Sequence, residues 1–127
     1  MSEVALNGGC RCGAVRYCWC RDCQYWAAGS CTVNAVFPVE AVTITGKLTD
    51  FCSTADSGNQ MHRQFCPSCG TPITSASQAR PHLIILRGGT FDEPAAVRPV
   101  ASIWTSSAPD WACVESSLPA FEKAAPA

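Results

Sequence analysis

The cysteines constrain this chain more than any other feature, because ten of its 127 residues are Cys and most of them stand in tight groups. The three groups are Cys10-x-Cys12, Cys18-x-Cys20-x-x-Cys23 and Cys66-x-x-Cys69. Cysteine at this frequency indicates either a disulfide scaffold or metal ligation. Buried free thiols would instead follow the periodicity of a hydrophobic core, which these groups do not.

The N-terminal sequence favours metal ligation over disulfides. Residues 1–5 contain no basic segment followed by an apolar run, so we expect no signal peptide. No apolar stretch approaches the roughly 18 residues of a membrane span, so we expect no membrane association. We therefore expect a cytoplasmic protein, in a compartment where clustered thiols stay reduced and usually bind metal. The net charge of −1, with no basic run, predicts no nucleic-acid partner.

The rest of the sequence predicts a single, mainly β domain over residues 1–127, built from short antiparallel strands. Short apolar runs rich in β-branched residues alternate with clusters of Gly, Pro, Ser and Asp. The expected strands are 13–17, 31–37, 41–46, 48–53, 72–75, 82–87 and 103–105. A hairpin turn is expected at 56–59, and the run at 82–87, apolar on both faces, should be central. Short helices are expected at 21–28 and 118–124.

The pair formed by Cys66 and Cys69 is the most specific metal signal. A Cys-x-x-Cys turn places two sulfurs at one edge of a tetrahedron. Pro67 pre-sets one φ angle of that turn, and Gly70 can adopt positive φ just after it. The spacing predicts a zinc knuckle, because a redox Cys-x-x-Cys pair requires a following helix, which Pro72 would interrupt.

The knuckle supplies only two ligands, so the other cysteines must complete the site. A closed structural zinc site uses four ligands, whereas a site with chemistry to perform keeps three and an open position. One division of the seven clustered thiols uses Cys10, Cys12, Cys66 and Cys69 together and leaves Cys18, Cys20 and Cys23 as an open site. The other division combines Cys20 and Cys23 with Cys66 and Cys69. Spacing alone does not separate the two.

Four motifs in order carry a resemblance to a known family: GGCRCGAVRY, CWCRDCQ, RQFCPSCGTPI, and IWTSSAPDW followed by LPAFE. The chain resembles, over residues 7–122, the glutathione-dependent formaldehyde-activating enzymes and their centromere-protein-V relatives. The resemblance implies a zinc-stapled β fold of the Mss4-like kind. It also implies a structural zinc on Cys10, Cys12, Cys66 and Cys69, and a second zinc on Cys18, Cys20 and Cys23.

One departure from the family concerns the spacing of these two sites. Only residues 13–17 separate Cys12 from Cys18, where family members have a longer segment. Six peptide steps span at most about 20 Å, so the two zinc sites are expected to lie close together.

The expected function follows from the open site. Zinc with three thiolates and a free position can bind another thiolate or polarise a small carbonyl. With the resemblance, this predicts a carbon–sulfur lyase like S-(hydroxymethyl)glutathione synthase, which joins glutathione or a related thiol to formaldehyde or a small aldehyde, with Cys18, Cys20 and Cys23 as catalytic residues. The alternative is a non-catalytic zinc-binding interaction module, which a fourth ligand such as Cys31 would favour. A third interpretation is a thiol-based redox sensor.

Several residues near the cysteine groups have two interpretations. Arg21 and Asp22 could bind a glutathione carboxylate, or form a local surface ion pair. Trp19 could shield the metal, although a core position is more common for tryptophan, as it is for Trp111. His62, four residues before Cys66, is either an outer partner of that zinc or a surface histidine.

Overall fold

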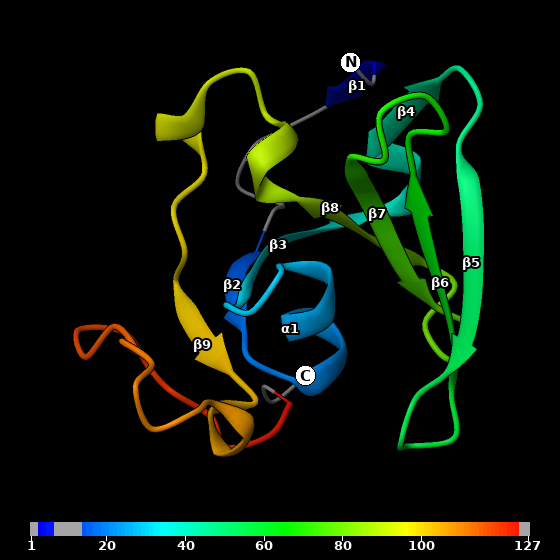
Figure 1. The fold of residues 1–127 in the computed structure, drawn as a ribbon. Helices are drawn as coiled ribbons and strands as arrows, with labels where there is room; N and C mark the ends of the chain where they lie inside the picture. Colours follow the sequence, from blue (N-terminus) through cyan, green and yellow to red (C-terminus); the bar gives the residue numbers. More distant parts are fainter. Residues whose placement is uncertain (1–2, 7–13, 125–127) are drawn as a thin grey trace.

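The computed structural model describes residues 3–6 and 14–124 of the chain (Figure 1). The strands and the α-helix are β1 Glu3–Leu6, β2 Ala14–Cys18, α1 Arg21–Trp26, β3 Thr32–Pro38, β4 Val42–Thr45, β5 Thr49–Thr54, β6 Gln60–Phe65, β7 Pro72–Ser77, β8 Leu83–Arg87 and β9 Ala101–Ile103. Short 3₁₀ turns lie at Val39–Ala41, Gly88–Thr90, Pro94–Ala96 and Thr105–Ser107. The mainly β fold class is thus confirmed. None of the helices in these residues is long and apolar enough to cross a membrane.

The strands form a seven-stranded sheet in the order β5-β6-β7-β8-β3-β2-β9, and β1 pairs with β4 in a separate two-stranded sheet. Neighbouring strands are antiparallel except β2 and β9, which are parallel, so the large sheet is mixed. The prediction that the run at 82–87 is central is confirmed, because β8 is the middle strand. In Figure 1 the sheet bends around α1, which lies between β2 and β6.

Most of the expected elements are found, with offsets of one or two residues at their ends. The turn at 56–59 joins β5 to β6: the N–H of Ala55 donates to the carbonyl of Asn59 at 2.8 Å, and Gly58 has φ 89°. The helix expected at 21–28 is α1. Strand β6, with the sequence QMHRQF, was not predicted, because it contains few β-branched residues.

Two expectations for the C-terminal part are wrong. The strand expected at 103–105 ends at Ile103, because Trp104 has φ 57° in the left-handed region and begins a 3₁₀ turn. The helix expected at 118–124 does not form. The backbone there pairs with β9 instead: the N–H of Ser102 donates to the carbonyl of Pro119, and the N–H of Phe121 donates to that of Ser102, both at 2.9 Å. Hydrogen bonds to the sheet thus replace those of a helix.

Along the central strands the two faces bury mostly different kinds of side chain, although Thr74 is buried on the face of Leu86 and Ile73 on the face of Ser75. On one face, Val15, Ala35, Phe37 and Leu86 form the buried hydrophobic core. The alternate positions of the same central strands carry buried polar side chains, namely Thr32, Asn34, Ser75 and Arg87. Side chains alternate between faces along each strand, and α1 covers this polar face through contacts with β3. A buried polar face needs partners, and it lies directly beside the cysteines of α1.

The glycine at the end of β8 makes a close packing contact, which leads to a stability prediction. A Cβ at Gly88 would lie 2.7 Å from Val33 Cγ1 and 3.1 Å from Val97 Cγ1, whereas a Cβ at Gly89 would meet nothing within 4 Å. Gly88→Ala should therefore lower the free energy of unfolding by about 1–3 kcal/mol through overpacking. Chemical denaturation of both variants measures this, with Gly89→Ala as the matched control. Equal stability of the two variants would contradict the prediction.

Candidate metal centre

Three cysteines from β2 and α1 converge because of where these elements end and begin. Cys18 is the last residue of β2. Cys20 is the N-cap of α1, with φ −61° and ψ 156°, and the N–H of Cys23 donates to its Sγ at 3.4 Å. A side chain at an N-cap folds back over the first helical turn, so the sulfurs of Cys20 and Cys23 lie together. The extended end of β2 brings Cys18 to the same place.

The resulting geometry fits one metal ion. The three Sγ atoms lie within 4.8 Å of one another, and no other such group of three Cys, His, Asp or Glu residues occurs in the described part of the chain. A tetrahedral zinc with Zn–S distances of about 2.3 Å holds its sulfurs about 3.8 Å apart, close to this spacing. Cys18 and Cys23 are buried, and Cys20 is partly exposed. The cluster therefore offers three soft donors and one free position.

The thiols of the cluster are electrostatically unequal. Hydrogen bonds from Cys18 and then Cys20 lower the pKa of Cys23 well below its usual value, and Thr32 and the positive charge of Arg87 lower it further. Hydrogen bonds to Cys20 and Cys23, together with burial, raise the pKa of Cys18. The three sulfurs therefore share protons among themselves, and a bound metal would take the place of those protons.

A buried arginine stands next to the cluster. Arg87 is 6% exposed, and burial lowers its pKa. Its Nη1 donates to Oδ1 of Asn34, and Nδ2 of Asn34 lies 4.0 Å from Cys23 Sγ. Nε and Nη2 of Arg87 have no hydrogen-bond partner among the described residues. A buried cation is costly unless it is paired, and three thiolates around Zn²⁺ carry a net charge of −1 that this guanidinium can offset.

Two cavities adjoin the centre. One of about 640 Å³ is lined by Tyr17, Trp19, Cys31 and Trp111 together with residues 113–116. The other, of about 330 Å³, is also lined by Cys31, together with Trp26, Thr32 and Arg87 among others. The larger cavity reaches the ligand loop itself, because Trp19 stands between Cys18 and Cys20. The cavities are lined by neighbours of the cluster, namely Trp19, Thr32 and Arg87, and not by the three cysteines themselves.

The structure decides several of the alternatives for the neighbouring residues. Arg21 donates to Gln24 Oε1 and lies over the ring of Tyr25, 5.3 Å from its centroid. Asp22 pairs with the buried Arg63 at 3.6 Å, so Arg21 and Asp22 do not pair with each other. Both side chains thus already have protein partners.

The tryptophans and the remaining thiol also differ in their surroundings. Trp19 is buried, as expected, but Trp111 is 67% exposed and lines the larger cavity, so the expectation of a core position is wrong for Trp111. Cys31 is half-buried and is not part of the three-sulfur group. Burial raises the pKa of Cys31, which favours its neutral thiol.

The knuckle at Cys66 and Cys69 has the expected shape. The N–H of Gly70 donates to the carbonyl of Cys66 at 2.8 Å, and Gly70 has φ 76°. Hydrogen bonds from the Thr71 side chain and backbone, and then from Cys66, lower the pKa of Cys69 to about 7. The other two members of the expected four-cysteine site, Cys10 and Cys12, lie outside the described residues, so that site stays a prediction.

The polar side chains around the cluster were hard to recognise from the sequence. Thr32 and Asn34 lie in an apolar strand, and Arg87 ends the most apolar strand of the chain. The alternation of these polar residues with apolar neighbours was only a weak indication that the two faces of the strand differ in polarity. Only the pairing of Asn34 with Arg87 across β3 and β8 shows that these residues meet beneath the cysteines.

The comparisons with known proteins agree with this geometry. A family model described as glutathione-dependent formaldehyde-activating enzyme matches residues 5–107, which include both the three-cysteine cluster and the knuckle. No match was found among curated proteins. The family match covers most of the chain and contains every clustered cysteine. The chain therefore belongs to the family of glutathione-dependent formaldehyde-activating enzymes.

Proposed function

We propose that this protein is a zinc-dependent carbon–sulfur lyase that joins glutathione, or a related thiol, to formaldehyde or another small aldehyde. The observation that carries the proposal is the cluster of three sulfur donors, Cys18, Cys20 and Cys23, whose chain neighbour Trp19 lines a cavity of small-molecule size. Catalytic zinc sites keep a position open in this way, whereas closed structural sites use four protein ligands. The absence of Cys31 from the group supports the enzyme over the interaction module.

Each group of residues at the site would have its own role in the reaction. Zinc bound to Cys18, Cys20 and Cys23 would supply a Lewis acid that keeps a substrate thiol deprotonated and polarises a small carbonyl. Arg87 would offset the negative charge of the three thiolates. Tyr17, Trp19 and Trp111 would hold the thiol substrate in the larger cavity. Holding the two reactants together lowers the entropic barrier of a bimolecular addition.

The structural zinc is part of the same proposal. Cys66 and Cys69 form a turn suited to two ligands of one ion. We assign the other two ligands to Cys10 and Cys12, as the family resemblance implies. Such a site contributes folding free energy directly, and it suits a short chain with a modest core. A cytoplasmic location would keep all of these thiols reduced.

The proposal is tested by following the combination of glutathione and formaldehyde by exchange NMR, with and without the zinc-loaded protein. We expect the exchange between free glutathione and its hydroxymethyl adduct to accelerate in proportion to protein concentration. An exchange rate that does not depend on the protein, for glutathione and for other small thiols, would refute the enzymatic proposal. That result would favour the non-catalytic zinc module.

A further inference from the structure

A second group of reactive side chains lies on β5 and β6, away from the cysteine cluster. Cys52 stands directly opposite His62 in the antiparallel register, and Asp50 stands two residues before Cys52. Directly opposite and diagonal neighbours in an antiparallel pair share one face, so the three side chains meet there. Arg63, the residue after His62, reaches Asp22 of α1, which shows that α1 covers the other face.

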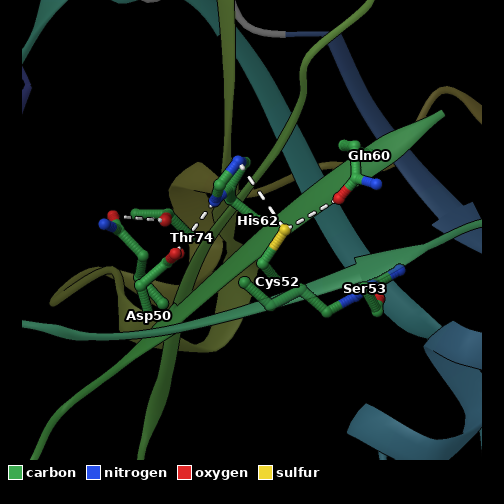
Figure 2. A network of polar contacts seen from close by, with 8 residues as sticks. Asp50, Cys52, Ser53, Gln60, His62 and Thr74 are labelled. Atoms are coloured by element: carbon green, nitrogen blue, oxygen red, sulfur yellow. Dashed lines mark hydrogen bonds and ion pairs between the residues drawn. The ribbon is translucent and has the colours of Figure 1, made fainter.

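The contacts within this group link a thiol, an imidazole and a carboxylate in series. His62 Nδ1 lies 2.9 Å from Asp50 Oδ2, and His62 Nε2 lies 4.0 Å from Cys52 Sγ. Figure 2 shows Cys52 between His62 and Gln60, with Asp50 on the other side of the His62 ring. When Nδ1 donates its proton to Asp50, Nε2 is the acceptor that faces the sulfur. Asp50 thereby fixes the tautomer that can take a proton from Cys52.

The group is accessible to small molecules. β5 is an edge strand of the large sheet, and Cys52 is exposed. The side chains of His62 and Asp50 are 42% and 38% exposed. A cavity of about 390 Å³ adjoins both of them and is lined further by residues of β7 and β8, including Ala76 and Ile84.

No other charge competes for the imidazole on this face. The same-face neighbours of His62 and Cys52 are Gln60 and Thr54 at one end, Gln64 beside Asp50, and Thr74 and Ala76 on β7. Among the described residues of β5, β6 and β7, Asp50 is thus the only charged partner on the face of His62.

We propose that Cys52 is a thiol–disulfide exchange site that takes low-molecular-weight disulfides of the glutathione type, with His62 as its base and Asp50 as a positioning residue. The proton of Cys52 Sγ passes to His62 Nε2, and the thiolate attacks one sulfur of the disulfide. The disulfide S–S bond breaks as the bond to Cys52 forms. The leaving thiolate takes the proton from His62, so that Cys52 is oxidised to a mixed disulfide and one thiol is released.

The polar surroundings of Cys52 favour a disulfide over an acyl compound as the reaction partner. Acyl transfer requires hydrogen-bond donors for the oxyanion that develops. The Cys52 thiol instead donates to Gln60 Oε1 at 3.0 Å, and Gln60 Nε2 donates to Thr54 Oγ1 at 3.1 Å. Disulfide exchange needs only a thiolate and a proton for the leaving sulfur. His62 serves both needs, because it accepts the proton of Cys52 and then donates it to the leaving sulfur.

The test uses the full-length, zinc-loaded protein and oxidised glutathione at neutral pH. Peptide-resolved mass spectrometry follows the mixed disulfide on Cys52, with the exposed thiol of Cys113 as the internal reference. We expect Cys52 to react about ten times faster than Cys113, because His62 and Asp50 stand in series beside Cys52 to accept its proton. His62→Asn should reduce the Cys52 rate to that of Cys113 while the Cys113 rate stays constant, and circular dichroism shows whether the variant is folded.

Further variants separate the role of Asp50 from a merely structural one. Asp50→Asn should lower the Cys52 rate and shift its pH profile, and Asp50→Glu should restore part of both. Gln64→Ala, on the same face beside Asp50, should leave the rate unchanged. Equal rates for Cys52 and Cys113, or a Cys52 rate unaffected by both His62→Asn and His62→Gln, would overturn the proposal. Loss of exchange activity at Cys52 would leave formaldehyde addition intact, so the two proposals fail separately.

Discussion

On the proposed function, replacing Cys20 with serine should lower the zinc content by one equivalent and abolish most of the proposed adduct-forming activity. The three sulfurs of Cys18, Cys20 and Cys23 are the whole donor set of the candidate centre, so the loss of one leaves two protein ligands. Serine is itself a good N-cap, so α1 should be preserved when the sulfur is lost. Metal Lewis acidity contributes several kcal/mol to catalysis, so we expect the rate of adduct formation to fall about 10³-fold.

The measurement is metal analysis of the intact protein alongside the exchange NMR assay. Cys113→Ser is the control for the metal content, because Cys113 is an exposed thiol outside the three-sulfur group. It should retain the full metal content, while Cys20→Ser loses one equivalent and keeps its fold by circular dichroism. Loss of all metal with unfolding would contradict the division into a structural and an open site. Retention of all the metal would show that Cys20 is not a ligand.

Truncating Leu86 should produce a large loss of stability. Leu86 lies on the central strand β8, is fully buried, and packs in the cluster with Val15, Ala35 and Phe37. Leu86→Ala removes three carbon atoms. The neighbouring strands β7 and β3 on the two sides of β8 keep the resulting cavity from collapsing. We expect the free energy of unfolding to fall by about 2–5 kcal/mol.

Urea denaturation at a fixed, saturating zinc concentration measures this loss, because metal binding to the native state adds to the apparent stability. Val39→Ala is the matched control, since Val39 is 45% exposed, and it should change stability by less than about 0.5 kcal/mol. A similar small effect of Leu86→Ala would mean that zinc, and not this core, dominates the stability of the fold.

The elements were easiest to predict where local chemistry decides them. The turn at 56–59 and the strand around Leu86 follow from turn residues and an apolar run, and both are present. Strand β6 has too few apolar residues to be recognised, and it forms because β5 and β7 pair with it on either side. The segment at 118–124 has a weak helical pattern, yet its backbone bonds to β9, because pairing across the fold outweighs weak local propensity.

The cysteine groups also show what local sequence determines and what only the tertiary structure decides. Their spacing showed that the thiols are clustered for metal binding, but it did not decide whether Cys20 and Cys23 join Cys18 or the Cys66–Cys69 pair; the structure brings Cys18, Cys20 and Cys23 together where the end of β2 meets the first turn of α1. Spacing does not reveal what lies against a site. Only the register of β3 with β8 brings Asn34 and Arg87 beneath Cys23, and only that of β5 with β6 brings His62 to Cys52. These partners are distant in sequence, and only the pairing of the strands makes them neighbours.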